Sequence, residues 1–340
     1  MSLDEVAKLA RVSTATVSRV INDSPAVKAS TRTRVLKVIA DLNYYPNLHA
    51  RTLAARKSRT LGMIVSNLRN PFFLDVFQQI DLLANESGYE VLVANTDYKP
   101  QRLVTSVRSM IGRRVAGLAV IVSEMEPALI DELLRSPVPV VFYDVGIAGR
   151  NITNIRVNYR KGIEKAAGYL HDLGHRRIGF VGHHAALGPI HARVQSLLEV
   201  APRFSPRLEI VHTAAADSLE GGRTAARDLL NSGFKPTAIM CVNDLMALGV
   251  VRELRERGLR VPDDVSVTGF DNISLAEFCS PSLTTIQIPR DQIGRLAFES
   301  LLASHEDQPI EGRELLIDPE FVVRDSTARA RTAGRVSMSA

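Results

Sequence analysis

The chain has 340 residues, and its hydrophobic share of 45% and charged share of 23% exclude a fibrous or fully disordered protein. This length exceeds what one hydrophobic core usually organises, so we expect at least two domains. The net charge of +5 is uneven: eleven basic and four acidic residues give +7 within residues 1–60, which leaves −2 for the rest. The basic character that attracts a polyanion is therefore concentrated at one end.

Three short helices are predicted at this basic end. The first two apolar sets have helical spacing and are separated by a short break: Leu3, Val6, Ala7 and Ala10, then Val17, Val20 and Ile21. Ser13 is placed to cap the second helix, because its hydroxyl can accept a backbone N–H of the first turn. A third set over residues 35–42 ends before Tyr45-Pro46, since the residue before a proline disfavours helix. A miniature core of this kind is typical of DNA-binding modules.

The outward face of the second helix carries short or hydrogen-bonding side chains that suit a major groove. These are Thr14, Ala15, Ser18, Arg19 and Asn22. The runs LDEVA at 3–7, VSTATVSRVIN at 12–22 and LNYYPN at 42–47 resemble the helix-turn-helix of the lactose/galactose repressor family of bacterial transcription regulators. Many consecutive positions match in order, which a short motif matched by chance does not do.

The resemblance implies roles on DNA. Thr14, Ala15 and Arg19 would face base edges, with Arg19 able to pair with a guanine and Ala15 able to offer only apolar contact. The residues that would position backbone phosphates are Ser13, Thr16 and Asn22. Two departures leave the local backbone geometry open, since Arg11 stands where the family often has glycine and Lys28 replaces a capping serine. The alternative is a helical hairpin that binds protein.

Residues 47–58 have good helix propensity, yet a helix this short is marginal alone because nucleation is costly. The resemblance implies a hinge helix that folds on the operator. Leu53 would then wedge into a base step of the minor groove and kink the duplex. A solvated linker with one stray leucine is the alternative.

From Leu61 onward, apolar runs alternate with helical patterns. Strands are predicted at 61–65, 91–94, 118–122 and 138–143, and again near 178–181, 208–211, 238–242 and 265–268. Helices are predicted at 73–84, 102–111 and 130–134. The alternation predicts two parallel α/β sheets wound right-handedly, with a cleft beside the carboxyl ends of their strands.

This stretch resembles the core of the periplasmic sugar-binding proteins. The resemblance is carried by SN and NPFF within 66–73, RRVAGL at 113–118, LGHRRIG at 173–179, NDLMALG at 243–249 and VPDDVSVTGFDN at 261–272. SLTTI at 282–286 resembles the crossover back to the first lobe. The implied α/β protein has a helix-turn-helix domain (1–46), a hinge (47–58), a first lobe (59–158 with 288–318), a second lobe (159–287 with 319–327) and a disordered tail (328–340).

Matching these motifs position by position implies an effector cleft between the lobes. Its lining would be Ser66, Phe72 and Phe73 with Asp144 near the rim, and Arg193, Asn243 and Asp271 from the second lobe. An arginine donor fork and a carboxylate that can accept two hydroxyls suit a small, polar, sugar-like ligand. Asn243 and Asp271 also fit turn or helix-cap positions, and the two phenylalanines fit a core.

Three departures separate this cleft from the family pattern. Asp217 stands where many relatives place an aromatic that stacks on the ligand, and Val157 where an acidic residue is common. The segment 193–206 is short and lacks the glycine that usually follows the arginine. The family resemblance therefore does not identify the ligand of this chain.

An α/β enzyme and a transport solute-binding protein are the competing classes. The sequence contains no G-x-G-x-x-G, no phosphate-binding loop and no G-x-S-x-G elbow. His183 and His184 are adjacent and cannot present one face of a helix, and His171, His175 and His191 lack partners at metal-ligand spacing. The histidines are therefore interpreted as surface or loop residues, and Cys241 and Cys279 as core residues. The acidic start of the chain does not resemble a secretory signal, and the DNA-binding module argues against transport.

We therefore expect a cytoplasmic homodimer that binds a pseudo-palindromic double-stranded DNA operator and a sugar-like small-molecule effector. No cofactor, metal or membrane contact is expected, because no run approaches the roughly 20 apolar residues of a spanning helix. The tail after Arg324 lacks a leucine heptad, so a zipper that joins dimers into tetramers is not indicated.

Overall fold

The computed structural model describes residues 2–21, 24–44, 58–144, 148–184, 188–303 and 311–331. It divides into two compact units, Met1–Ser58 and Arg59–Ala340. Within the described ranges, no helix is both long and apolar enough to cross a membrane. The predicted hinge helix lies outside the described residues, apart from Ser58.

The first unit contains three helices, α1 (Leu3–Leu9), α2 (Thr14–Ile21) and α3 (Ala29–Asp41). Ser2 and Glu5 form a capping box that starts α1. The six side chains of the core are short: Val6, Ala7, Ala10, Val17, Val20 and Val35. This core is built from the predicted apolar stripes, so the polar sides of the helices remain outside.

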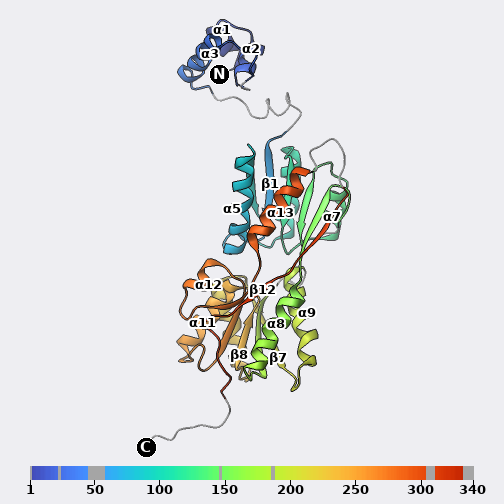
Figure 1. Ribbon diagram of the computed structural model, residues 1–340, viewed down its shortest axis with the longest axis vertical. Coiled ribbons are helices and arrows are strands. Elements are labelled where there is room, and N and C mark those ends of the chain that lie inside the picture. The colour runs from blue at the N-terminus through green and yellow to red at the C-terminus, as the bar shows by residue number, and fades with distance from the viewer. Residues whose placement is uncertain are drawn as a thin grey trace, which may run out of the picture. The chain divides into compact units, whose positions relative to one another are not determined.

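The first lobe of the second unit is a six-stranded sheet with the order β11-β5-β4-β3-β1-β2, in which all neighbouring strands are parallel. The strands are β1 (Thr60–Val65), β2 (Glu90–Asn95), β3 (Gly117–Ile121), β4 (Val140–Tyr143), β5 (Ile152–Val157) and β11 (Glu314–Ile317). Its helices are α5 (Pro71–Glu86), α6 (Pro100–Gly112), α7 (Pro127–Leu134) and α13 (Arg290–Ala303). Helix α13 packs against α5, and α5 contacts β1, as Figure 1 shows.

Alternate residues of these strands pack on opposite faces of the sheet. Met63 belongs to the core that includes α5 and α13, whereas the next residue, Ile64, packs with α6 and α7. A parallel sheet covered on both faces needs apolar residues at consecutive positions. This is why β1, β3 and β4 appear in the sequence as unbroken apolar runs.

The second lobe repeats the scheme with the order β12-β10-β9-β8-β6-β7. Its strands are β6 (Arg177–His183), β7 (Glu209–Ala215), β8 (Ala238–Cys241), β9 (Ser266–Asp271), β10 (Thr284–Gln287) and β12 (Glu320–Val322), and only the β10–β12 pair is antiparallel. The helical elements are α8 (Tyr159–Asp172), α9 (Pro189–Val200), η1 (Ala201–Arg203), α10 (Leu219–Asn231), α11 (Asp244–Glu256) and α12 (Ser274–Phe278).

The chain crosses between the lobes after β5, after β10 and after β11. The sequence assigned the second crossing to residues 282–286, but β10 occupies 284–287 within the second sheet, so the crossing follows it. Asn67 follows β1 and donates to Asp217, which follows β7. The carboxyl ends of strands from both sheets therefore meet at the boundary between the lobes.

Each of the eight predicted strands coincides with a strand of the structure, whereas β5, β10, β11 and β12 were not predicted as strands. β5 carries Asn154 and Arg156, and β11 and β12 are short and partly exposed at sheet edges, so none forms a continuous apolar run.

The structure differs from the predicted disordered tail (328–340) at the start of that segment. Ala328 and Ala330 donate backbone hydrogen bonds to Ser266 Oγ and Leu173 O, so the chain follows the second lobe to at least residue 330.

Candidate functional site

The outer face of α2 is the first candidate site. Val17 and Val20 are buried and fix the orientation of the helix. This orientation leaves Ala15 and Arg19 exposed and Thr14 half-buried on the side away from the core. The predicted face of the helix is therefore present.

Ser13 caps this helix as the sequence predicts. Its Oγ accepts the backbone N–H of Thr16 at 3.2 Å and lies 2.9 Å from Thr16 Oγ1. Both side chains therefore organise the start of α2, and the half-buried Ser18 follows one turn later. Asn22 and Leu53 lie outside the described residues.

The two departures from the family pattern correspond to local features of the backbone. Arg11 in the α1–α2 turn has φ of 50°, the left-handed region in which glycine is favoured. Lys28 is the N-cap residue of α3 and makes no side-chain capping bond. Each position therefore lacks the residue type that its backbone favours.

Five of the seven predicted effector residues line one space at the lobe boundary, and the space has about 30 Å³ of free volume. They are Phe72, Phe73, Arg193, Asn243 and Asp271. Phe72 packs edge-on against Phe73 and also contacts Tyr143, with ring centroids 5.3 and 5.7 Å apart. Asn243 Oδ1 accepts the Met246 N–H at 2.8 Å, so this residue is also the cap of α11.

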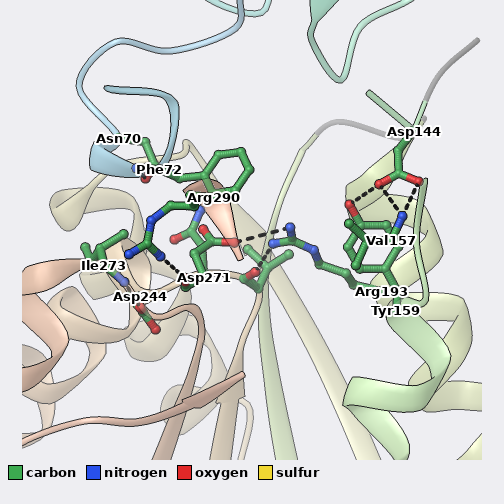
Figure 2. A network of polar contacts seen from close by, with 12 residues as sticks. Asn70, Phe72, Asp144, Val157, Tyr159, Arg193, Asp244, Asp271, Ile273 and Arg290 are labelled. Carbon is green, nitrogen blue, oxygen red and sulfur yellow. Dashed lines mark hydrogen bonds and ion pairs between the residues drawn. The ribbon is translucent and has the colours of Figure 1, made fainter. Parts of the chain in front are cut away.

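Arg193 is buried and lines this space, and Figure 2 shows its polar contacts. Its guanidinium donates to Val242 O at 2.5 Å and to Asp271 Oδ1 at 3.3 Å, and it lies 4.0 Å from the ring centroid of Phe270. Asp271 has φ of 105°, and its carbonyl accepts from Arg290. Arg290 also pairs with Asp75 of α5 at 2.8 Å, which ties the second crossover to both lobes.

Ser66 and Asp144 lie apart from these five residues and line neither this space nor its larger neighbour. Ser66 is fully buried and donates to Glu124 Oε2 at 2.6 Å. Asp144 accepts from Val157 N at 3.0 Å and from the Tyr159 hydroxyl at 2.6 Å. Asp144 therefore fastens the first crossover, as Figure 2 shows.

A larger cavity of about 520 Å³ adjoins this space, and Tyr98 and Ser123 line both. Asp217 is one of the residues that line it. The Asp217 carboxylate accepts from Asn67 Nδ2 at 3.0 Å and from the Tyr98 hydroxyl, both in the first lobe, and from Asn243 Nδ2 at 2.6 Å in the second. This one side chain therefore joins the two lobes.

Sequence reasoning missed Asn67, Tyr98, Glu124 and Asp217 as cleft residues. Asp217 was noted only as a departure from an aromatic position, and this was the one available signal. The interpretation of His183 as a surface or loop residue is wrong. His183 ends β6, is 7% exposed and packs on Tyr98 with ring centroids 4.8 Å apart, because the last residue of an inner parallel strand faces the other lobe.

Burial perturbs several carboxyl groups around the cleft. It raises the pKa of Asp271 to about 7, although Arg193 and Arg290 oppose the shift. The pKa of Asp244 is raised to about 8 by burial and by the Asp271 charge. Burial likewise raises the pKa of Asp144 to about 6. Among the described residues, no group of three or more metal-ligating side chains is placed to hold an ion.

Comparisons with known proteins agree with this arrangement. Residues 2–47 match the bacterial regulatory proteins of the lacI family, and residues 167–327 match a periplasmic binding protein-like domain. The chain is 34% identical over 327 residues to the HTH-type transcriptional repressor PurR of Photobacterium profundum, which covers 96% of this chain and 98% of the relative. It is 33% identical over 328 residues to the HTH-type transcriptional repressor CytR of Escherichia coli, with 96% of each covered.

Among solved structures, the Lac repressor dimer bound to operator and the anti-inducer ONPF has a TM-score of 0.82 at 30% identity, and the match covers 96% of this chain and 99% of that one. A helix-turn-helix unit combined with a two-lobed binding body defines a ligand-responsive DNA-binding transcription regulator. This chain belongs to the lacI family of bacterial regulatory proteins.

Proposed function

We propose that this protein is a transcriptional repressor that binds a pseudo-palindromic operator as a homodimer and senses a small polar effector between its lobes. One observation carries the proposal. A single chain combines a helix whose outer face presents Ala15 and Arg19 with a cavity of about 520 Å³ that both lobes line. Because its target is chromosomal DNA, we place its action in the cytoplasm.

On DNA, Thr14, Ala15 and Arg19 contact base edges in the major groove. Arg19 is the strongest candidate for base recognition, because a guanidinium can pair with both acceptors of a guanine. Ser13, Thr16, Ser18 and Asn22 position phosphates, and Leu53 of the hinge enters the minor groove. A homodimer places two α2 helices about 34 Å apart along the duplex, one helical turn.

The effector occupies the continuous space between the lobes. Phe72 and Phe73 offer apolar surface, whereas Arg193, Asn243 and Asp271 offer hydrogen bonds. The three hydrogen bonds that Asp217 accepts connect the lobes. The ligand must therefore either replace these hydrogen bonds or add a further one to Asp217. Asp144 and Ser66 support the first crossover and the cavity wall.

Effector binding is coupled to the operator through lobe closure. The Asp217 bonds and the bond from Arg290 to the Asp271 carbonyl both connect the two lobes, so a ligand that replaces or strengthens them changes the angle between the lobes. That change alters the separation of the two hinges in the dimer. The coupling is expected to be about 1 to 3 kcal/mol in operator affinity.

A binding experiment tests the DNA-binding role. The full chain is used to select duplexes from a randomised pool, and the dissociation constant is measured by fluorescence anisotropy at several salt concentrations. Arg19→Ala should weaken binding by about 1 to 3 kcal/mol and relax the preference at one base pair. The matched control is Arg207→Ala, an exposed arginine of the second lobe. A wild-type chain without salt-sensitive sequence preference refutes the proposal.

The effector role has its own test. Sugars, polyols, sugar acids and nucleobases are screened for stabilisation of the full chain, since a ligand stabilises the fold that it binds. Each stabilising compound is then added to the operator titration, and a change in affinity is expected. NMR then shows whether the ligand is recovered unchanged. An unchanged ligand indicates a sensor, and a converted ligand indicates an enzyme. A ligand that binds in the cleft without altering operator affinity contradicts the coupling.

A further inference from the structure

Two inner carboxylates, which are the two that are not exposed, line the 520 Å³ cavity, one from each lobe. Glu124 follows β3 of the first lobe and is 8% exposed, and Asp217 follows β7 of the second. The charged groups at the rim are the exposed Arg69, Asp97 and Glu126. Four carboxylates and one arginine therefore line the cavity.

Neutral donors hold both inner carboxylates. Glu124 accepts from Ser66 Oγ at 2.6 Å, from Ser123 N at 3.1 Å and from the Thr96 hydroxyl. Asp217 accepts from two amides and the Tyr98 phenol. These bonds orient the carboxylates without neutralising them, and within the described ranges no ion pair involves either group.

The two buried titratable groups beside these carboxylates, His183 and Tyr98, do not supply a positive charge. Burial lowers the pKa of His183 below its ordinary value, so its ring is neutral at pH 7. The phenol of Tyr98 keeps its proton, because burial and the charges of Asp217 and Glu124 raise its pKa. At the rim, Asp97 is paired with Lys99 at 3.3 Å and with Arg102 at 3.9 Å. A buried carboxylate without a cation, such as Glu124, is destabilising, and a positively charged ligand would supply the partner.

A second observation also indicates that a molecule binds here. Arg193, whose side chain is 6% exposed, lines the adjoining 30 Å³ space, and among the described residues its Nε has no hydrogen-bond partner. A buried N–H without an acceptor is unfavourable, and an oxygen of a bound molecule satisfies it. The ligand therefore meets an acidic wall at one end and an orphan donor at the other.

We propose that the effector is a small organic cation, with an ammonium or amidinium nitrogen that binds Glu124 and Asp217 and an oxygen that accepts from Arg193. This assignment rests on the proposed function of the cleft and narrows its ligand class from polar molecules to aminated ones. The ring of Tyr98 offers a face for the same cation. Neutral sugars and sugar acids are disfavoured, because neither supplies the positive charge.

Matched ligand triplets test the assignment on the full chain at pH 7 and constant ionic strength. The triplets are glucosamine, glucose and glucuronate; ethanolamine, ethylene glycol and glycolate; and putrescine, butanediol and succinate. Thermal shift and calorimetry are the readouts. The ammonium member of at least one triplet should bind about tenfold more tightly than its partners, as expected for hydrogen bonds to charged groups. Ammonium members that bind no better than the hydroxyl members in every triplet overturn it, as does preferred binding of a carboxylate.

Isosteric variants locate the effect. Asp217→Asn and Glu124→Gln should each weaken binding of the ammonium probe about tenfold and change binding of its hydroxyl partner by less than about twofold. The controls are the exposed Asp172→Asn and Glu199→Gln in the second lobe. If Asp217→Asn fails to fold, Glu124→Gln decides the question. An unchanged charge preference in the folded variants overturns the assignment.

Operator binding, measured on the same samples, separates this inference from the proposed function. A chain that binds its operator but shows no ammonium preference retains the proposed function and loses this assignment. A chain that prefers ammonium ligands but binds no operator loses the proposed function instead.

Discussion

The helix-turn-helix unit and the cleft between the lobes place their candidate functional side chains in opposite environments. Ala15 and Arg19 project from a helix held by a core of short side chains, and solvent surrounds them. Arg193 and Asp271 are almost fully buried and are held by each other and by neighbouring rings. Changes in the cleft should therefore alter folding stability strongly, whereas changes around α2 should alter it weakly.

The largest effect is expected at Arg193. Arg193→Ala removes the guanidinium that pairs with the buried Asp271 carboxyl group, which should lower the free energy of unfolding by about 3 to 5 kcal/mol. Urea unfolding followed by circular dichroism measures this loss. Arg207→Ala, which removes an exposed arginine from the same lobe, should cost less than about 0.5 kcal/mol. Similar losses in the two variants would remove the contrast between buried and exposed charge.

A pH effect of a few kcal/mol is expected from Asp244. Its pKa is about 8 in the folded chain against an ordinary 3.8, so the folded state binds the proton more tightly. This group's contribution to stability is therefore fully present at acid pH, falls as pH rises from about 4 to 8, and is constant above. Asp244→Asn removes this dependence, and the hydroxyl of Thr285, which now donates to Asp244, can turn to accept.

Unfolding free energies of wild type and Asp244→Asn, measured from pH 5 to 9, test this sign. As pH rises to 8, the free energy of unfolding of the variant should increase relative to that of wild type. Above pH 8 the difference between the two should stay constant. Asp172→Asn, an exposed carboxylate on α8, is the matched control and should follow wild type throughout. Parallel curves for Asp244→Asn over the whole range would contradict the raised pKa.

The same contrast explains what the sequence could predict. Ser13, Val17 and Arg19 lie within two turns of one another, so their spacing alone indicates a cap, a core and an exposed face. The strands with continuous apolar runs were equally predictable, because a parallel sheet buried on both faces requires them. β5 has no such run, since Asn154 and Arg156 interrupt it.

The cleft was only partly predictable, because its residues come from distant parts of the chain. Arg193 and Asp271 were found through motifs, whereas the bond from Asn67 to Asp217 spans 150 residues and depends on where the lobes meet. The cavity is lined at strand ends by polar residues that, in sequence, are ordinary turn residues. The one signal in the sequence was Asp217, which stands where many relatives have an aromatic residue. This replacement indicated that the chemistry of the cleft differs from the family pattern.

A gain of about 1 kcal/mol is expected in the first unit from Lys28→Ser. Lys28 is the N-cap of α3, provides no side-chain acceptor and places a positive charge at the positive end of the helix. Serine supplies the acceptor and removes the charge. Hydrogen exchange of α3 amides measures the gain. The matched change Lys37→Ser, in the middle of the same helix, should destabilise it instead, because serine is a poorer helix former than lysine.

The smallest effect is expected at Arg11. Its φ of 50° favours glycine, but glycine also increases the conformational entropy of the unfolded chain, so the two contributions partly cancel. Arg11→Gly should therefore stabilise the first unit by only about 0.5 kcal/mol, seen as slower hydrogen exchange in α1 and α2. Arg34→Gly, at an exposed position within α3, should destabilise by about 1 kcal/mol, because there the backbone is helical and only the entropy cost remains. If both variants lose stability equally, the turn does not hold Arg11 in the left-handed region, and the α1–α2 connection has another conformation.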